Sequence, residues 1–243
     1  NKMTLDELQK LNTAIDWRSF FESAGIKGID EVVVRHTEYI QKLDMAFKKP
    51  INTWKTYMKW HLLNDMASNL SSDFEQQKFD FYATTMRGTK QMKPRWKRAL
   101  EKCDATVGEQ LGKLFVEKHF PEESKQQVLD MIANINEVFK ERVKELEWMG
   151  DSTKMKAMEK LSKFTYKIGY PDKWEDYSSV DIAPDALAQN VMNMNEFGYN
   201  HMINKIGKPI DKGEWVMNPQ TINAYYNPTM NEIVFPAAIL QPP

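Results

Sequence analysis

Apolar residues that recur every three or four positions constrain the fold of this chain more than any other feature of its sequence. The clearest run follows Pro121, where one helical face holds a single polar residue, Arg142. The apolar members of this face are Val128, Met131, Ile132, Ile135, Val138, Phe139 and Leu146. Side chains with this spacing lie on one face of an α-helix, so the run predicts a long helix after Pro121.

The same spacing recurs over most of the chain, and Pro and Gly mark the limits of the runs. A capping box at Thr4-Leu-Asp-Glu7 predicts an early helix start. We predict further helices over the residues that follow Thr37, Trp54, Phe74, Pro94, Pro121, Asp151 and Pro184. The helix after Asp151 is expected to run toward Tyr166 and to stop before Gly169. A short β-branched run, residues 31–35, instead predicts an isolated strand.

The last part of the chain has a different period. Residues 221–226 and 232–235 alternate apolar and polar side chains, and the turn-forming segment 227–231 lies between them, so this part predicts a β-hairpin. A two-stranded hairpin is marginally stable alone. It either belongs to a further domain or folds back onto the helices. We therefore predict a mainly α fold, with an all-helical domain over residues 1–206 and the opening strands of a second domain over residues 207–243.

Composition sets modest limits on the partners of the chain, although net charge alone does not exclude a basic nucleic-acid-binding face. The 33 Lys and Arg residues nearly balance the 34 Asp and Glu residues, and no long cationic block or nucleic-acid-reading motif occurs, so we predict no nucleic-acid partner. The apolar runs are too short to cross a bilayer, which predicts no transmembrane segment within this chain. The single cysteine, Cys103, excludes an intrachain disulfide framework and is expected to be a buried or half-buried thiol.

No catalytic or metal-binding residue is predicted from spacing. A zinc helix needs two histidines four residues apart, so that both nitrogens meet one ion. The four histidines, which do not have this spacing, are His36, His61, His119 and His201. They are expected to be ordinary surface or core residues, although a site built from distant histidines stays open. The pair Glu122-Glu123 is expected at a helix N-terminus, where the helix dipole favours negative charge.

Several short motifs occur along the chain in a fixed order. The longest are Asn223-Ala-Tyr-Tyr226 and Phe235-Pro-Ala-Ala-Ile-Leu-Gln-Pro-Pro243. The others are Pro94-Arg-Trp-Lys-Arg98, Leu114-Phe-Val-Glu117, Glu123-Ser-Lys125, Leu146-Glu-Trp-Met149, Ile168-Gly-Tyr-Pro-Asp172 and Lys212-Gly-Glu-Trp215. Together they resemble the landmarks of the neprilysin (M13) family of zinc endopeptidases, from about residue 31 onward.

This resemblance implies an enzyme of which the chain is one part. In that family the His-Glu-x-x-His zinc helix lies further along the sequence, so we expect an N-terminal fragment that ends before it. The intact protein is then expected to be a Zn²⁺-dependent metalloendopeptidase that hydrolyses small peptides. Its zinc ligands and catalytic residues would lie in a C-terminal, thermolysin-like catalytic region, whose first strands are residues 207–243. The fragment alone is expected to be inactive.

The resemblance also bears on where the protein acts. Animal members of the family are disulfide-rich ectodomains, whereas this chain has one cysteine, so it is more similar to bacterial members. A place in the bacterial cell envelope or periplasm, or secretion, is favoured on that basis. A cytoplasmic location stays open.

Asn223 and Ala224 are the substrate-binding residues that the resemblance implies. In the family this pair lies on the edge strand of the cleft, where a peptide can add as a further strand. The Asn223 amide, with two donors and an acceptor, could also bind the peptide backbone. The residue pattern alone, without the family resemblance, predicts instead that Asn223 begins the hairpin and that its amide satisfies local backbone groups.

Two other classes of function stay open. One is a peptide-binding or interaction module that uses the helical surface or the hairpin edge without catalysis. The other is a purely structural helical domain.

Overall fold

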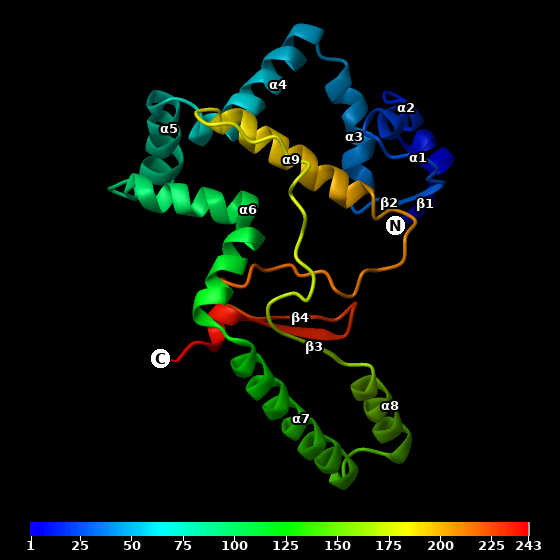
Figure 1. The fold of residues 1–243 in the computed structure, drawn as a ribbon. Coiled ribbons are helices and arrows are strands. Elements are labelled where there is room, and N and C mark those ends of the chain that lie inside the picture. The colour runs from blue at the N-terminus through cyan, green and yellow to red at the C-terminus, as the bar shows by residue number, and fades with distance from the viewer. Residues whose placement is uncertain (243) are drawn as a thin grey trace. The chain divides into compact units, whose positions relative to one another are not determined.

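The computed structural model describes residues 1–242, most of which lie in helices (Figure 1). The α-helices are α1 (Leu5–Leu11), α2 (Trp17–Ser23), α3 (Thr37–Phe47), α4 (Ile51–Met66), α5 (Ser72–Phe79), α6 (Arg95–His119), α7 (Glu122–Glu145), α8 (Asp151–Ser162) and α9 (Leu187–Ile203). The strands are β1 (Lys2–Thr4), β2 (Glu31–Val33), β3 (Thr165–Gly169), β4 (Tyr225–Asn227) and β5 (Glu232–Pro236). Short helical turns are η1 (Ala67–Asn69), the π-helical η2 (Asp80–Thr85) and η3 (Ala237–Leu240). The prediction of a mainly α fold with a C-terminal hairpin is confirmed.

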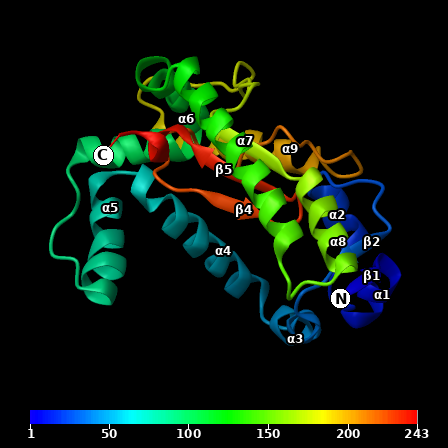
Figure 2. The same cartoon turned by 90° about the horizontal axis from the view of Figure 1, so that it is seen from below.

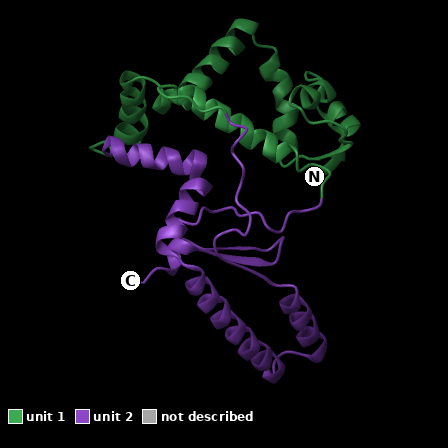
Figure 3. Ribbon diagram, viewed as in Figure 1, with its two compact units in different colours: residues 1–92, 181–208 green, residues 93–180, 209–243 purple. Residues whose placement is uncertain are grey.

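The chain forms two compact units (Figure 3). The first contains residues 1–92 and 181–208, and the second contains residues 93–180 and 209–243. Each unit is therefore built from two separate stretches of chain. The predicted boundary after residue 206 concerns the domains of the intact protein and stays a prediction.

The first unit begins with a capped helix and a small sheet. The predicted capping box at α1 is confirmed, because the Glu7 N–H donates to Thr4 Oγ1 at 3.2 Å and the Thr4 N–H donates to Glu7 Oε2 at 2.7 Å. β2 was expected to be isolated, but it pairs with β1 in an antiparallel ladder. The residues buried beside this ladder are Leu5, Leu8, Trp17 and Val34. β2 thus gains the partner that a lone strand lacks.

The predicted helices after the first strand pair are confirmed, with differences at some ends. α9 begins at Leu187, three residues after Pro184, and α5 ends at Phe79, where the π-helical η2 follows. Pro50, Pro94 and Pro121 each stand directly before the first residue of a helix. The helix after Asp151, however, ends at Ser162 and does not reach Tyr166. The residues that follow it form β3, because Thr, Tyr and Ile are strand-favouring side chains that fit a half-buried pleated surface.

The second unit holds a mixed three-stranded sheet in the order β3-β5-β4. β4 and β5 form the predicted antiparallel hairpin, and β3 pairs with β5 in parallel. α7 and α8 lie side by side as a helical hairpin that leads into β3 (Figure 2). The hairpin thus obtains its third strand from a region that was expected to be helical. Residues 221–224, expected at the start of the first strand, lie outside β4.

Apolar packing in the second unit lies where α6, the sheet and η3 meet. Its buried centre is Val116, Phe120 and Ala237. Gly169, the last residue of β3, has a φ of +77°, and a Cβ placed there would lie 2.5 Å from the Phe120 ring. Both the backbone conformation and the close ring therefore require glycine at this position.

Part of the helical surface is apolar and exposed. On α7 the exposed apolar side chains are Met131, Ile135, Val138 and Phe139. Even so, no helix within residues 1–242 is long and apolar enough to span a membrane.

We predict that Gly169→Ala destabilises the second unit. A left-handed backbone costs an alanine about 1–2 kcal/mol, and crowding against Phe120 adds about 1–3 kcal/mol. The free energy of unfolding, measured by urea denaturation, should fall by about 2–5 kcal/mol. Gly207→Ala, in the first unit, is the control for the backbone cost alone, because Gly207 has a φ of +75° with nothing within 4 Å of the added Cβ. Equal losses in the two variants would exclude a role for the Phe120 contact.

Candidate functional site

Asn223 and Ala224 lie directly before β4, at the edge of the three-stranded sheet. β4 pairs with β5 through Tyr225 opposite Val234 and Asn227 opposite Glu232. On its other side, no strand of residues 1–242 pairs with β4. An edge strand of this kind offers main-chain N–H and C=O groups to a further strand. The sequence-predicted pair is therefore at the entry to an open sheet edge.

The side chain of Asn223 is exposed and makes a local hydrogen bond. The Ala224 N–H donates to Asn223 Oδ1 at 2.8 Å, and the Asn223 N–H donates to the Thr221 carbonyl at 3.0 Å. The Asn223 amide oxygen thus accepts a hydrogen bond from a neighbouring backbone N–H. This agrees with the alternative prediction, in which the Asn223 amide satisfies only local backbone groups. Its Nδ2 makes no hydrogen bond within residues 1–242, so two donors stay available for another molecule. The role of the pair in substrate binding stays a prediction.

A buried ion pair joins the two neighbouring strands of this sheet. Lys167 Nζ on β3 lies 2.7 Å from Glu232 Oε2 on β5, and the two side chains are 8% and 1% exposed. The same ammonium group donates to the carbonyl of Glu214 at 2.6 Å. Glu232 Oε1 is buried and has no partner within residues 1–242. The spacing of residues in the sequence did not predict this ion pair. The only indication in the sequence was that each of the two strands has a charged residue next to strand-favouring residues.

Tyr225 extends this polar cluster to the edge strand. It lies opposite Val234, and its hydroxyl accepts a hydrogen bond from the Val216 N–H at 3.1 Å. Burial raises the pKa of Tyr225, and the nearby Glu232 and Glu214 carboxylates raise it further against the lowering effect of the Val216 bond. The hydroxyl therefore stays neutral at ordinary pH and links Val216 to β4.

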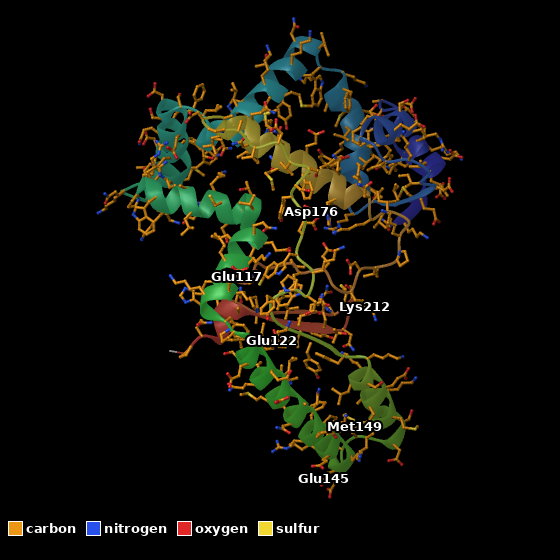
Figure 4. The ribbon with its side chains drawn as sticks, in the orientation of Figure 1. Glu117, Glu122, Glu145, Met149, Asp176 and Lys212 are labelled. Carbon is orange, nitrogen blue, oxygen red and sulfur yellow. The ribbon has the colours of Figure 1, made fainter. Side chains whose placement is uncertain are left out.

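Two of the sequence motifs meet at the start of α7. Lys125 Nζ lies 3.0 Å from Asp172 Oδ1 and 4.2 Å from the centre of the Tyr170 ring. The Tyr170 hydroxyl donates to the carboxylate of Glu122, which is labelled in Figure 4. Burial and this carboxylate raise the pKa of Tyr170 to about 12. Glu122 lies in the first turn of α7, as predicted, and these motif residues bind one another.

The histidines and the cysteine show no reactive arrangement. Within residues 1–242, no group of three His, Cys, Asp or Glu side chains could hold a metal ion. His61 packs against the rings of Tyr57 and Trp60, and His119 packs against Phe115. Cys103 was expected to be buried or half-buried, but its thiol is exposed. Its neighbours on the same face of α6, Ala99 and Leu100, are exposed as well.

Comparison with known sequences relates this chain to one family. Residues 1–171 match the family model described as peptidase family M13. The chain is 34% identical over 259 residues to endothelin-converting enzyme 1 of Bos taurus. It is 32% identical over 269 residues to neprilysin of Mus musculus. Both alignments cover 100% of this chain but only 34% and 35% of the relatives, so the chain spans about a third of their length.

Solved structures give the same relation. The inhibitor complex of zinc metalloprotease ZMP1 of Mycobacterium tuberculosis superposes with a TM-score of 0.89 at 38% identity, over 100% of this chain and 37% of that one. PepO of Lactobacillus rhamnosis superposes with a TM-score of 0.81 at 23% identity, over 100% of this chain and 39% of that one. The second likeness is one of fold alone.

We predict that Lys167→Met strongly destabilises the second unit. The substitution leaves the Glu232 carboxylate buried without a counter-ion, and removing one partner of a buried pair costs about 3–5 kcal/mol. The double variant Lys167→Met with Glu232→Leu removes both charges and should recover most of this loss. Urea denaturation of the two variants tests this. A double variant as unstable as the single one would show that the charge of Glu232 is not the cause.

Proposed function

The chain belongs to peptidase family M13, and from this membership we propose that the intact protein is a zinc-dependent endopeptidase that cleaves small peptides. Family membership supports a peptidase. The observation on this chain that supports the finer proposal is the open edge of β4, entered through Asn223 and Ala224. The curated relatives are about three times as long as this chain, so the activity belongs to the intact protein.

In this proposal the edge of β4 binds the substrate as an additional strand. Main-chain hydrogen bonds give the affinity, and they demand no particular substrate side chain. The Nδ2 donors of Asn223 bind a carbonyl of the peptide, while its Oδ1 keeps the bond from the Ala224 N–H. A substrate held mainly by its backbone suits an endopeptidase that accepts many sequences.

Zinc would be held by other parts of the intact polypeptide. The described residues contain no group that fits the ion, so we assign no zinc ligand and no catalytic base to this chain. The contribution of these residues is to bind and orient the peptide. We further propose that residues 207–243 are the opening strands of the catalytic region, and that residues 1–243 alone are inactive.

We predict that Asn223→Ala lowers kcat/KM of the intact protein on a short peptide by about one to two orders of magnitude. A hydrogen bond contributes roughly 0.5–1.5 kcal/mol net, and more when its loss strands a buried partner. Each 1.4 kcal/mol is about tenfold in rate. Zinc content and thermal stability should change little, because the side chain is exposed.

Asn195→Ala is the matched control, since Asn195 is an exposed asparagine on α9. It should leave kcat/KM unchanged. An unchanged kcat/KM in Asn223→Ala would leave this side chain with its local backbone bond only. Intact protein without any peptidase activity would instead favour a non-catalytic peptide-binding module.

We also predict a difference in zinc content between the intact protein and residues 1–243. After chelation and addition of zinc, metal analysis should find one tight zinc per intact chain and none per 243-residue chain. Chelation should abolish peptide cleavage by the intact protein, and zinc should restore it. One tight zinc in the 243-residue chain would overturn the placement of the ligands outside it.

A further inference from the structure

Helix α6 bends in its middle (Figure 1). Val107 has a φ of −115° and a ψ of 34°, which are not helical values. One residue earlier, Thr106 Oγ1 donates to the carbonyl of Lys102 at 2.8 Å. Back-bonding of this kind competes with the helical ladder and bends helices. The bend gives side chains from another segment access to the helix backbone.

Two amide side chains from the segment before β4 bind at this bend. Asn218 Nδ2 donates to the carbonyl of Asp104 at 3.1 Å. Gln220 Nε2 donates to the carbonyl of Gly108 at 2.8 Å and also to the carboxylate of Asp104. Both partners of this nitrogen are acceptors, which fixes the orientation of the Gln220 amide.

Glycines on α6 allow the segment to lie against the helix. A Cβ at Gly108 would lie 2.1 Å from Asn218 Nδ2, and a Cβ at Gly112 would lie 2.6 Å from Cδ of Pro219. The Asn218 side chain could rotate away from such a Cβ, whereas the Pro219 ring is fixed to the backbone. Gly112 is therefore the position at which any larger residue must displace the segment itself.

The remaining residues of the segment before β4 are also held by individual hydrogen bonds. Residues 214–220 form no helix or strand. The Glu214 carbonyl is bound by Lys167, the Val216 N–H by Tyr225, and the Pro219 carbonyl by the Ala238 N–H at 2.9 Å. Asn223 follows three residues after Gln220, so the place of the sheet edge depends on these contacts.

We propose that Gln220 and Gly112 are positioning residues that hold the peptide-binding edge in place against the bend of α6. This inference rests on the proposed function, because it assigns them a role in the same edge. Gln220 acts through Asn223 and Ala224 and touches no substrate. Gln220 Oε1 is buried without a hydrogen-bond partner within residues 1–242. Because a buried polar atom without a partner destabilises the fold, stability alone does not explain this side chain.

The test measures how strongly kcat/KM of the intact protein depends on hydrogen bonds from the backbone of the peptide substrate. The probes are one peptide substrate and a set in which a single backbone amide, away from the cleaved bond, is N-methylated. In the wild-type protein, at least one N-methyl group should lower kcat/KM by about tenfold, because it removes a main-chain bond to the edge. In Gly112→Ala and in Gln220→Met, kcat/KM on the parent peptide should fall by about tenfold and the N-methyl penalty should nearly disappear.

Gly198→Ala is the matched control, since Gly198 lies inside α9 with nothing within 4 Å of the added Cβ. It should keep both the activity and the N-methyl penalty. If the penalty is present in the wild-type protein and unchanged in the folded variants, the positioning role is overturned while strand addition stands. If the wild-type protein shows no penalty at any position, strand addition itself is overturned. Should Gly112→Ala not fold, as judged by circular dichroism, Gln220→Met alone decides.

Discussion

The second unit depends on the buried contact between Lys167 and Glu232. The ammonium group bonds to a carboxylate on the neighbouring strand and to the Glu214 carbonyl, so it joins β3, β5 and the segment before β4 at one point. Burying two charges is expensive, and such pairs are seldom kept for stability alone. Here the pair specifies how the strands meet. A shift of β3 by one residue would turn Lys167 to the other face of the sheet and leave Glu232 buried alone.

This contact and the bend of α6 act on the same irregular segment from two sides. Lys167 holds it at Glu214, and α6 holds it at Asn218 and Gln220. Neither contact involves the repeating hydrogen bonds of a helix or sheet. An open sheet edge binds a peptide more tightly when the edge is already ordered, since a mobile edge loses conformational entropy at each binding event. In the proposed function, the polar contacts of this irregular segment would keep the edge ordered.

The sequence predicted those parts of the fold that depend on local pattern. Pro94 and Pro121 marked helix starts, and alternation marked β5, because these signals act within a few residues. β3 was missed because a strand of five residues after a helix has no period long enough to distinguish it. The ion pair and the bend of α6 join residues far apart in sequence, which no local pattern reports. Asn223 and Ala224 were predicted as substrate-binding residues through the family motif alone, since their side chains carry no periodic signal, and this role stays a prediction.

The parallel pairing of β3 with β5 also sets an order of events during synthesis. β3 is made early, yet the strand that pairs with it is made more than sixty residues later, after the whole of α9. Until then β3 has no partner from its own sheet, and Lys167 lacks Glu232, the carboxylate that it binds in the folded unit. Pairings between distant segments form slowly, and unpaired strands are where nascent chains aggregate. The second unit therefore completes its sheet only when β5 has left the ribosome, and a chaperone that covers β3 in the interval would act while this strand is unpaired.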